Sequence, residues 1–145
     1  QRDIEFLFHI PGMESTVTDL EIRGRSDIAQ LDLTDLGVTP ESDDLATQNT
    51  TDLAEALGWI YVSEGSTLGA AFLFKSAQQE LQMDADFGAR NLAAYPEGRA
   101  KVWKRFVESL DNAPFDQQQQ DRVIQGAKLG FQRFGELLEN LKNLK

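Results

Sequence analysis

Residues 57–74 read LGWIYVSEGSTLGAAFLF, and the rest of the chain is organised around this stretch. It is almost entirely apolar or small, and Glu64 is the only charged residue inside it. Its length and composition indicate a long buried helix. We expect this helix to begin at a cap on Thr50 or Thr51 and to end near Met83.

Gly65 and Gly69 lie inside the predicted helix, where a glycine costs roughly 1 kcal/mol relative to alanine. Because residues four positions apart share one helix face, the two glycines leave a strip without Cβ atoms, with Ser66 beside it. Such a strip lets either a second helix or a flat ligand approach the backbone closely. From the spacing alone, close packing of helices is the favoured interpretation, since small residues four apart are a weak motif.

The composition limits the classes of function. A chain of 145 residues can bury a sizeable core, and we expect residues 1–145 to form a single domain. A net charge of −10 argues against nucleic acid or an anionic membrane as the main partner. The absence of cysteine excludes disulfides, iron–sulfur clusters and thiol catalysis, and it is compatible with a cytoplasmic location. Glu64 and the polar residues around it argue against a membrane span.

Hydrophobic periodicity predicts further helices at residues 2–9, 15–22, 26–36, 98–110 and 116–142. Ser15 and Ser26 are the predicted caps of the second and third of these helices. Residues 38–50 are expected to form an acidic connection rich in turns, and Phe87 and Tyr95 to anchor an irregular segment in the core. No strand-like alternation or internal repeat is present, so the predicted class is all-α, an irregular multi-helical bundle.

Few residues offer catalytic chemistry. His9 is the only histidine, which rules out a multi-histidine metal site within the chain and weakens any serine triad. Lys101 and Arg105 stand out, because they are four positions apart in a basic cluster and can grip carboxylates from one helix face. An alternative of equal weight is that these basic residues form surface salt bridges with Glu97 and Glu108.

The last predicted helix carries Phe131 and Phe134 among several glycines. Aromatic residues at this spacing usually belong to the core, unless a cofactor wall is implied independently. Together, a bare glycine strip, a cationic pair and an aromatic wall suit a flat hydrophobic molecule with carboxylate tails. Heme has that shape.

Four segments of the chain resemble heme oxygenases, especially the bacterial enzymes. The central run YVSEGSTLGAAF is similar to the distal helix of that family, with its YVLEGSxLGG signature. The other three are RGRSDIAQLDLTDLG upstream and GRAKVWKRFVESLD and VIQGAKLGFQRFGELL downstream. Together the four segments cover nearly the whole chain, and their order and spacing fit the family.

The resemblance implies an oxidoreductase that opens heme to biliverdin, carbon monoxide and ferrous iron. The reaction uses O2 and electrons from a partner such as a ferredoxin or a flavin reductase. Gly65 and Gly69 would let the distal helix kink over the heme face, with Ser66 where animal enzymes have an aspartate that orders water. The implied heme contacts also include Tyr61, and Ala70 replaces a glycine of the family. Lys101 and Arg105 match positions that steer the propionates, and Phe131 matches an aromatic residue of the pocket.

The resemblance also implies an axial iron ligand that this chain lacks. The proximal histidine of the family lies on an N-terminal helix, which we expect upstream of Gln1, and His9 matches a different segment. Two alternatives stay open: a non-catalytic heme-binding relative without the axial ligand, and a helical interaction module whose glycine strip packs against a neighbouring helix.

Overall fold

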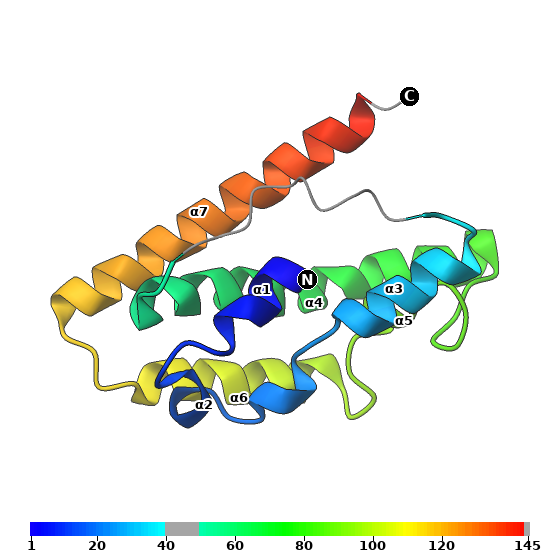
Figure 1. Ribbon diagram of the computed structural model, residues 1–145. Coiled ribbons are helices and arrows are strands. Elements are labelled where there is room, and N and C mark those ends of the chain that lie inside the picture. The colour runs from blue at the N-terminus through cyan, green and yellow to red at the C-terminus, as the bar shows by residue number, and fades with distance from the viewer. Residues whose placement is uncertain (40–49, 144–145) are drawn as a thin grey trace.

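The computed structural model describes residues 1–39 and 50–143. Their secondary structure is helical: α1 (Arg2–Leu7), α2 (Met13–Thr16), the 3-10 helix η1 (Leu20–Ile22), α3 (Ser26–Asp35), α4 (Leu53–Leu81), α5 (Arg90–Ala93), α6 (Arg99–Asn112) and α7 (Gln117–Lys142) (Figure 1). No strand occurs in these two ranges, so the all-α prediction is confirmed. Most of the predicted connection at 38–50 lies outside the described residues.

Helix α4 is the central element, as its apolar sequence predicts. Its cap is Asp52, whose carboxylate accepts a hydrogen bond from the Glu55 backbone N–H at 2.8 Å, so the predicted caps at Thr50 and Thr51 are wrong. A carboxylate is a stronger acceptor than a hydroxyl and is favoured near the positive end of the helix dipole. None of the described helices is long and apolar enough to cross a membrane.

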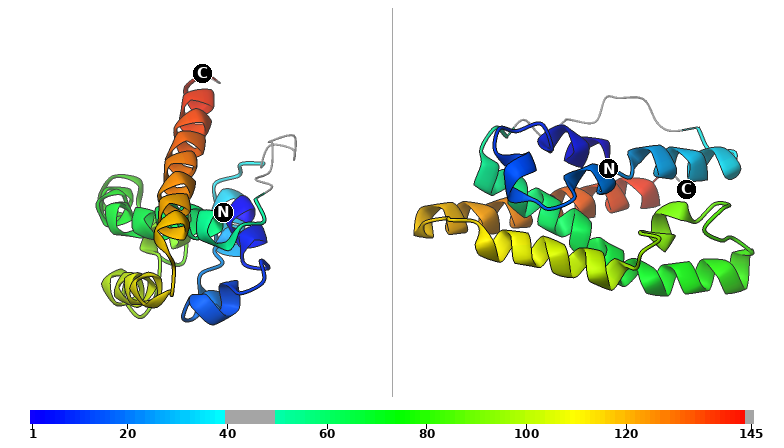
Figure 2. Two further views of the ribbon diagram at one scale, coloured as in Figure 1. Left: turned by 90° about the vertical axis from the view of Figure 1, so that its left-hand side faces the viewer. Right: turned by 90° about the horizontal axis from the view of Figure 1, so that it is seen from below.

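Helices α4 and α7 cross with their backbones in direct contact. A Cβ atom on Gly58 would lie 2.0 Å from the carbonyl oxygen of Val123, and one on Gly126 would lie 1.9 Å from the carbonyl oxygen of Glu55. Only residues without side chains allow so close an approach. Beyond the crossing, α7 rises away from α4 toward its C-terminal end (Figures 1 and 2).

The apolar core lies on the other side of α4. Leu57 and Ile60 of α4 pack there with Phe106 of α6 and with residues from the start of the chain: Leu7, Met13, Val17 and Leu20. All of these side chains are buried. Helices α1, α2 and α6 therefore hold one face of α4, while α7 crosses another near its N-terminal end.

The two short helices at the start of the chain differ from the sequence prediction. Ser15 does not cap a helix through Ile22, because its hydroxyl donates to the Gly12 carbonyl at 3.0 Å and the backbone turns left-handed at Asp19. Ser26 is the first residue of α3 and not its cap, because its backbone N–H and its hydroxyl both donate to the Glu5 carboxylate. Both serines therefore lie inside the first turn of a helix, where the hydroxyl is a hydrogen-bond donor and does not accept from a backbone N–H as a cap would.

The segment before α6 was predicted in part. Tyr95 is buried, as expected, but Phe87 is 49% exposed and does not anchor the core. The segment is held by Arg90, which ion-pairs with Asp32 and Asp35 of α3. The predicted helices at 98–110 and 116–142 are confirmed within two residues, and α7 begins with a capping box between Asp116 and Gln119.

Candidate functional site

The glycine strip of α4 faces open space over part of its length. No described atom lies within 4 Å of a Cβ placed on Gly69. On Gly65 such an atom would meet the Trp103 ring at 3.6 Å, which is an ordinary van der Waals contact. Close helix packing, the interpretation that the spacing favoured, therefore applies to Gly58 and not to this strip.

Apolar side chains surround the strip on the same helix. Four of them are exposed by 36 to 79%: Tyr61, Leu68, Phe72 and Leu73. The Tyr61 ring lies 5.4 Å from that of Trp103, between centroids, and Trp103 stacks at 5.9 Å on the buried Phe106. Helix α6 thus supplies an aromatic contact at one edge of the strip, and the residues that the structure describes leave the rest of this apolar α4 surface exposed.

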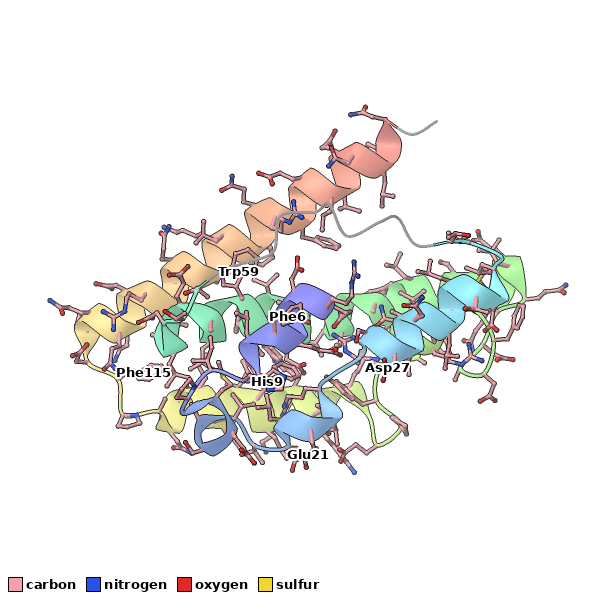
Figure 3. All side chains as sticks on the ribbon, viewed as in Figure 1. Phe6, His9, Glu21, Asp27, Trp59 and Phe115 are labelled. Atoms are coloured by element: carbon pink, nitrogen blue, oxygen red, sulfur yellow. The ribbon has the colours of Figure 1, made fainter. Side chains whose placement is uncertain are left out.

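Helix α7 presents a second apolar wall beyond the crossing. A Cβ atom on Gly130 would lie 3.2 Å from the Val62 side chain and 3.6 Å from the Trp59 ring, and Figure 3 shows Trp59 at the α4–α7 crossing. An apolar stripe runs along α7 from Val123 to Leu141, and its members beyond the crossing are 44 to 62% exposed: Phe131, Phe134, Leu138 and Leu141. Among the described residues, the stripe therefore packs on α4 near the crossing, and its two aromatic residues are exposed where α7 leaves α4.

The cationic pair does not join this face. Arg105 is held by two acidic residues, with Nε 2.7 Å from Asp19 Oδ2 and Nη2 2.5 Å from Glu97 Oε1. Arg105 and Trp103 are two positions apart on α6, about 200° around the axis, so they point to nearly opposite sides. The hydrogen bond from Arg105 is the main cause that lowers the pKa of Glu97. For Arg105 the structure supports the salt-bridge alternative, with Asp19 in place of Glu108.

Lys101 lies one turn before Arg105 on the same face of α6 and is exposed. Ser66 is also exposed, and its hydroxyl donates to the Ser63 carbonyl at 2.6 Å. With its only proton in that bond, Ser66 can accept a hydrogen bond from the site but not donate one to it. Of the predicted site residues, the structure therefore brings together those of α4 and leaves the cations of α6 apart.

His9 lies just past the end of α1 (Figure 3). Its neighbours Phe8 and Ile10 pack against the core cluster that contains Ile60. Ile60 and Gly69 are nine positions apart, about two and a half turns, and so project from opposite sides of α4. His9 is therefore on the core side of the helix. The described residues contain no group of three or more His, Cys, Asp or Glu side chains that could hold a metal ion.

Sequence reasoning missed a buried polar cluster next to the strip. Arg23 and Glu64 form an ion pair of 2.8 Å, and the Tyr95 hydroxyl donates to the same carboxylate. Burial, followed by the negative charge of Glu64, raises the pKa of Tyr95. The available signal was Glu64 itself, because a single carboxylate within an apolar helix requires a partner.

Comparisons with known proteins identify the family of this chain. The heme oxygenase family model matches residues 31–140. The chain is 46% identical over 140 residues to the heme oxygenase PigA of Pseudomonas aeruginosa, covering 96% of this chain and 70% of that protein. It also resembles the crystal structure of the NO- and CO-bound heme oxygenase from Neisseria meningitidis, with a TM-score of 0.87 and 35% identity over 96% of this chain and 69% of that one. The chain belongs to the heme oxygenase family.

Family membership confirms the resemblance that the four sequence segments indicated, and with it an enzyme that degrades heme. The alternative of a helical interaction module is not favoured.

Proposed function

We propose that heme binds on the uncovered face of α4 at Gly65 and Gly69 and is cleaved there, with O2 and external electrons, to biliverdin, carbon monoxide and ferrous iron. The observation that carries this proposal is the combination of a bare helix backbone at Gly69 with exposed aromatic side chains at Phe131 and Phe134. A flat macrocycle needs both, a surface free of Cβ atoms against which to lie and apolar walls that exclude water.

The residues of α4 have distinct parts in this proposal. Gly69 leaves room above the heme plane, because no described atom fills the space that a Cβ would occupy. Tyr61 and Gly65 face the heme edge from the side that Trp103 supports. Ser66 accepts a hydrogen bond from a water molecule in the site, since its own proton is bound to Ser63. The chain thereby orients heme and keeps a polar acceptor near the open side.

The contacts at the heme periphery follow from the two neighbouring helices. Phe131 covers one part of the apolar macrocycle from α7. The contact of Lys101 and Arg105 with the propionates stays a prediction from the resemblance, and the ion pairs of Arg105 with Asp19 and Glu97 weigh against it. Lys101, which is exposed, is the better candidate of the two.

Two further components are part of the proposal. The axial ligand of the iron is not His9, because that residue lies on the core side of α4. The electrons come from a separate redox protein of the ferredoxin or flavin reductase class. The cytoplasmic location stays a prediction.

The test is a titration of the complete gene product with hemin followed by absorbance, after which ascorbate is added in air. We expect a saturable Soret band and its replacement by the bands of biliverdin. Gly69→Leu should bind heme poorly or turn it over at least about tenfold more slowly, because the leucine side chain occupies the open space; this corresponds to at least about 1.4 kcal/mol. Gln78→Leu is the matched control, since position 78 is exposed on the opposite side of the same helix.

Each other outcome has a definite meaning. Heme binding without biliverdin would make the protein a non-catalytic heme carrier. No saturable binding would remove the proposed function altogether. Normal turnover by Gly69→Leu would show that heme lies elsewhere on the fold.

A further inference from the structure

A buried ion pair holds α4 from the side away from Gly69. Arg23 Nη1 lies 2.8 Å from Glu64 Oε2, and both side chains are at most 2% exposed. The Tyr95 hydroxyl lies 2.8 and 2.9 Å from the two oxygens of the same carboxylate. We refer to Arg23, Glu64 and Tyr95 as the buried cluster.

The buried cluster is costly as a means of stabilising the fold. Two charges lose their hydration, and their attraction offsets this loss only when the geometry is good. The geometry here meets that condition, because Arg23 also donates from Nε to the Thr18 carbonyl at 3.0 Å and from Nη2 to the Val102 carbonyl at 3.3 Å. An apolar residue at position 64 could join the same elements. What the ion pair adds is a fixed orientation of the Glu64 side chain, since a carboxylate that accepts from two donors, Arg23 and Tyr95, has few orientations available.

The orientation of Glu64 matters because this residue lies beside the glycines of α4. Glu64 immediately precedes Gly65, and a second contact follows one turn later, where Arg99 Nη1 of α6 donates to the Thr67 carbonyl at 2.6 Å. Glycines make this turn of α4 more deformable than any other, since they lack the side chains that restrict the backbone. The buried cluster and Arg99 thus contact the same turn of α4 that contains the two glycines, on the side of the helix away from Gly69.

We propose that the buried cluster is a positioning device for heme cleavage, which sets the rotation of α4 about its axis at Gly65. A rotation of about 20° would move a Cα atom, about 2.3 Å from the helix axis, by about 0.8 Å. Shifts of that size alter which edge of a bound macrocycle is shielded and cost up to about a hundredfold in rate. Through this rotation Arg23, Glu64 and Tyr95, none of which needs to touch heme, determine which carbon bridge is opened. This inference rests on the proposed function.

The test removes one hydroxyl from the cluster and measures where heme is cut. Tyr95→Phe keeps the ring and leaves the Arg23–Glu64 pair intact, so we expect a folded protein that still binds heme. Chromatography of the biliverdin isomers from the heme-loaded complete protein should show a ratio changed by at least about threefold from wild type. Thr34→Ala is the control, because the Thr34 hydroxyl of α3 donates to the Gln30 carbonyl of its own helix and not to the buried cluster or to α4. Its isomer ratio should equal that of wild type.

A second measurement does not depend on turnover. Hydrogen exchange in the ligand-free protein should become faster at the amides of residues 65–69 in Tyr95→Phe and stay unchanged in α6. An unchanged isomer ratio together with unchanged exchange would overturn the inference, and so would an equal shift of the ratio in Thr34→Ala. Failure of wild type to cleave heme would instead count against the proposed function, and the exchange result would then decide whether the cluster positions α4.

Discussion

Replacing Gly58 with alanine would place a methyl group 2.0 Å from the Val123 carbonyl oxygen and 2.4 Å from the Ala127 backbone nitrogen. Both neighbours are backbone atoms, so no change of rotamer relieves the collision, and α7 has to move by more than about 1 Å to restore an ordinary contact distance. Replacing Gly69 with alanine is the same chemical change on the same helix. There, no described atom lies within 4 Å of the added methyl group.

The two substitutions should therefore have opposite effects on stability. Alanine gains about 1 kcal/mol over glycine inside a helix, and Gly69→Ala receives that gain without a collision. Overpacking costs about 1–3 kcal/mol, and the rigid contact at Gly58 places it at the upper end, which leaves Gly58→Ala a net loss of about 2 kcal/mol. For a domain of this size, the midpoint temperature of thermal unfolding should rise by about 2–4 °C in Gly69→Ala and fall by about 4–8 °C in Gly58→Ala.

The assay is thermal and urea unfolding of the ligand-free protein, followed by circular dichroism. The urea slope should stay the same in both variants, so that the midpoints report stability. Comparable destabilisation in Gly69→Ala would refute the reasoning, because it would mean that another part of the protein covers the strip. A neutral result for Gly58→Ala would mean that the α4–α7 crossing is looser than the structure has it.

Three further predictions concern the site and the charges around it. Phe131→Ala should weaken heme binding ~10–100-fold in an absorbance titration, since burying a phenylalanine contributes about 1.5–3 kcal/mol; Ile124, which is 54% exposed against 62% for Phe131 and lies nearer the start of α7, provides the control Ile124→Ala. His9→Ala should leave the position of the Soret band unchanged, and a shift would make His9 an iron ligand. The hydrogen bond from Arg90 lowers the pKa of Asp35 below its ordinary value of 3.8, so the stabilisation is present above that value and is lost as the pH falls through the lower folded pKa. Acid unfolding curves should then be less steep in Asp35→Asn than in wild type, and identical curves would show that the pair contributes nothing.

The positions of the long helices follow from the sequence because their signals are local. The apolar run of α4 and the amphipathic pattern of α7 each decide an element without reference to the rest of the chain. The ends are less predictable: Asp52 is the cap where Thr50 or Thr51 was expected, because three adjacent residues can all cap a helix and the hydrogen bond to the Glu55 backbone N–H shows which of them does. Ser26 shows the same limit over a longer range, since its hydrogen-bond partner Glu5 is 21 positions away.

The candidate site was predictable in its residues and not in its arrangement. Gly58, Gly65 and Gly69 look alike in the sequence, and the spacing cannot tell which of them meets another backbone. The difference arises because α7 crosses at Gly58 and has already diverged at Gly69. The role of Arg105 also depends on distant residues, because Asp19 comes close to it only when the start of the chain folds against α6.

The contact between the backbones of α4 and α7 has a consequence for how this fold can vary. Where side chains separate two helices, their sizes set the interhelical angle, and substitutions there change it. At Gly58 and Gly126 the peptide groups themselves meet, so backbone geometry fixes the distance between the helix axes at the crossing. Residues further along α7, such as Phe131 and Phe134, can then be exchanged without changing that distance. The spacing of the two helices and the chemistry of the exposed α7 surface are therefore set by different parts of the chain and can change independently.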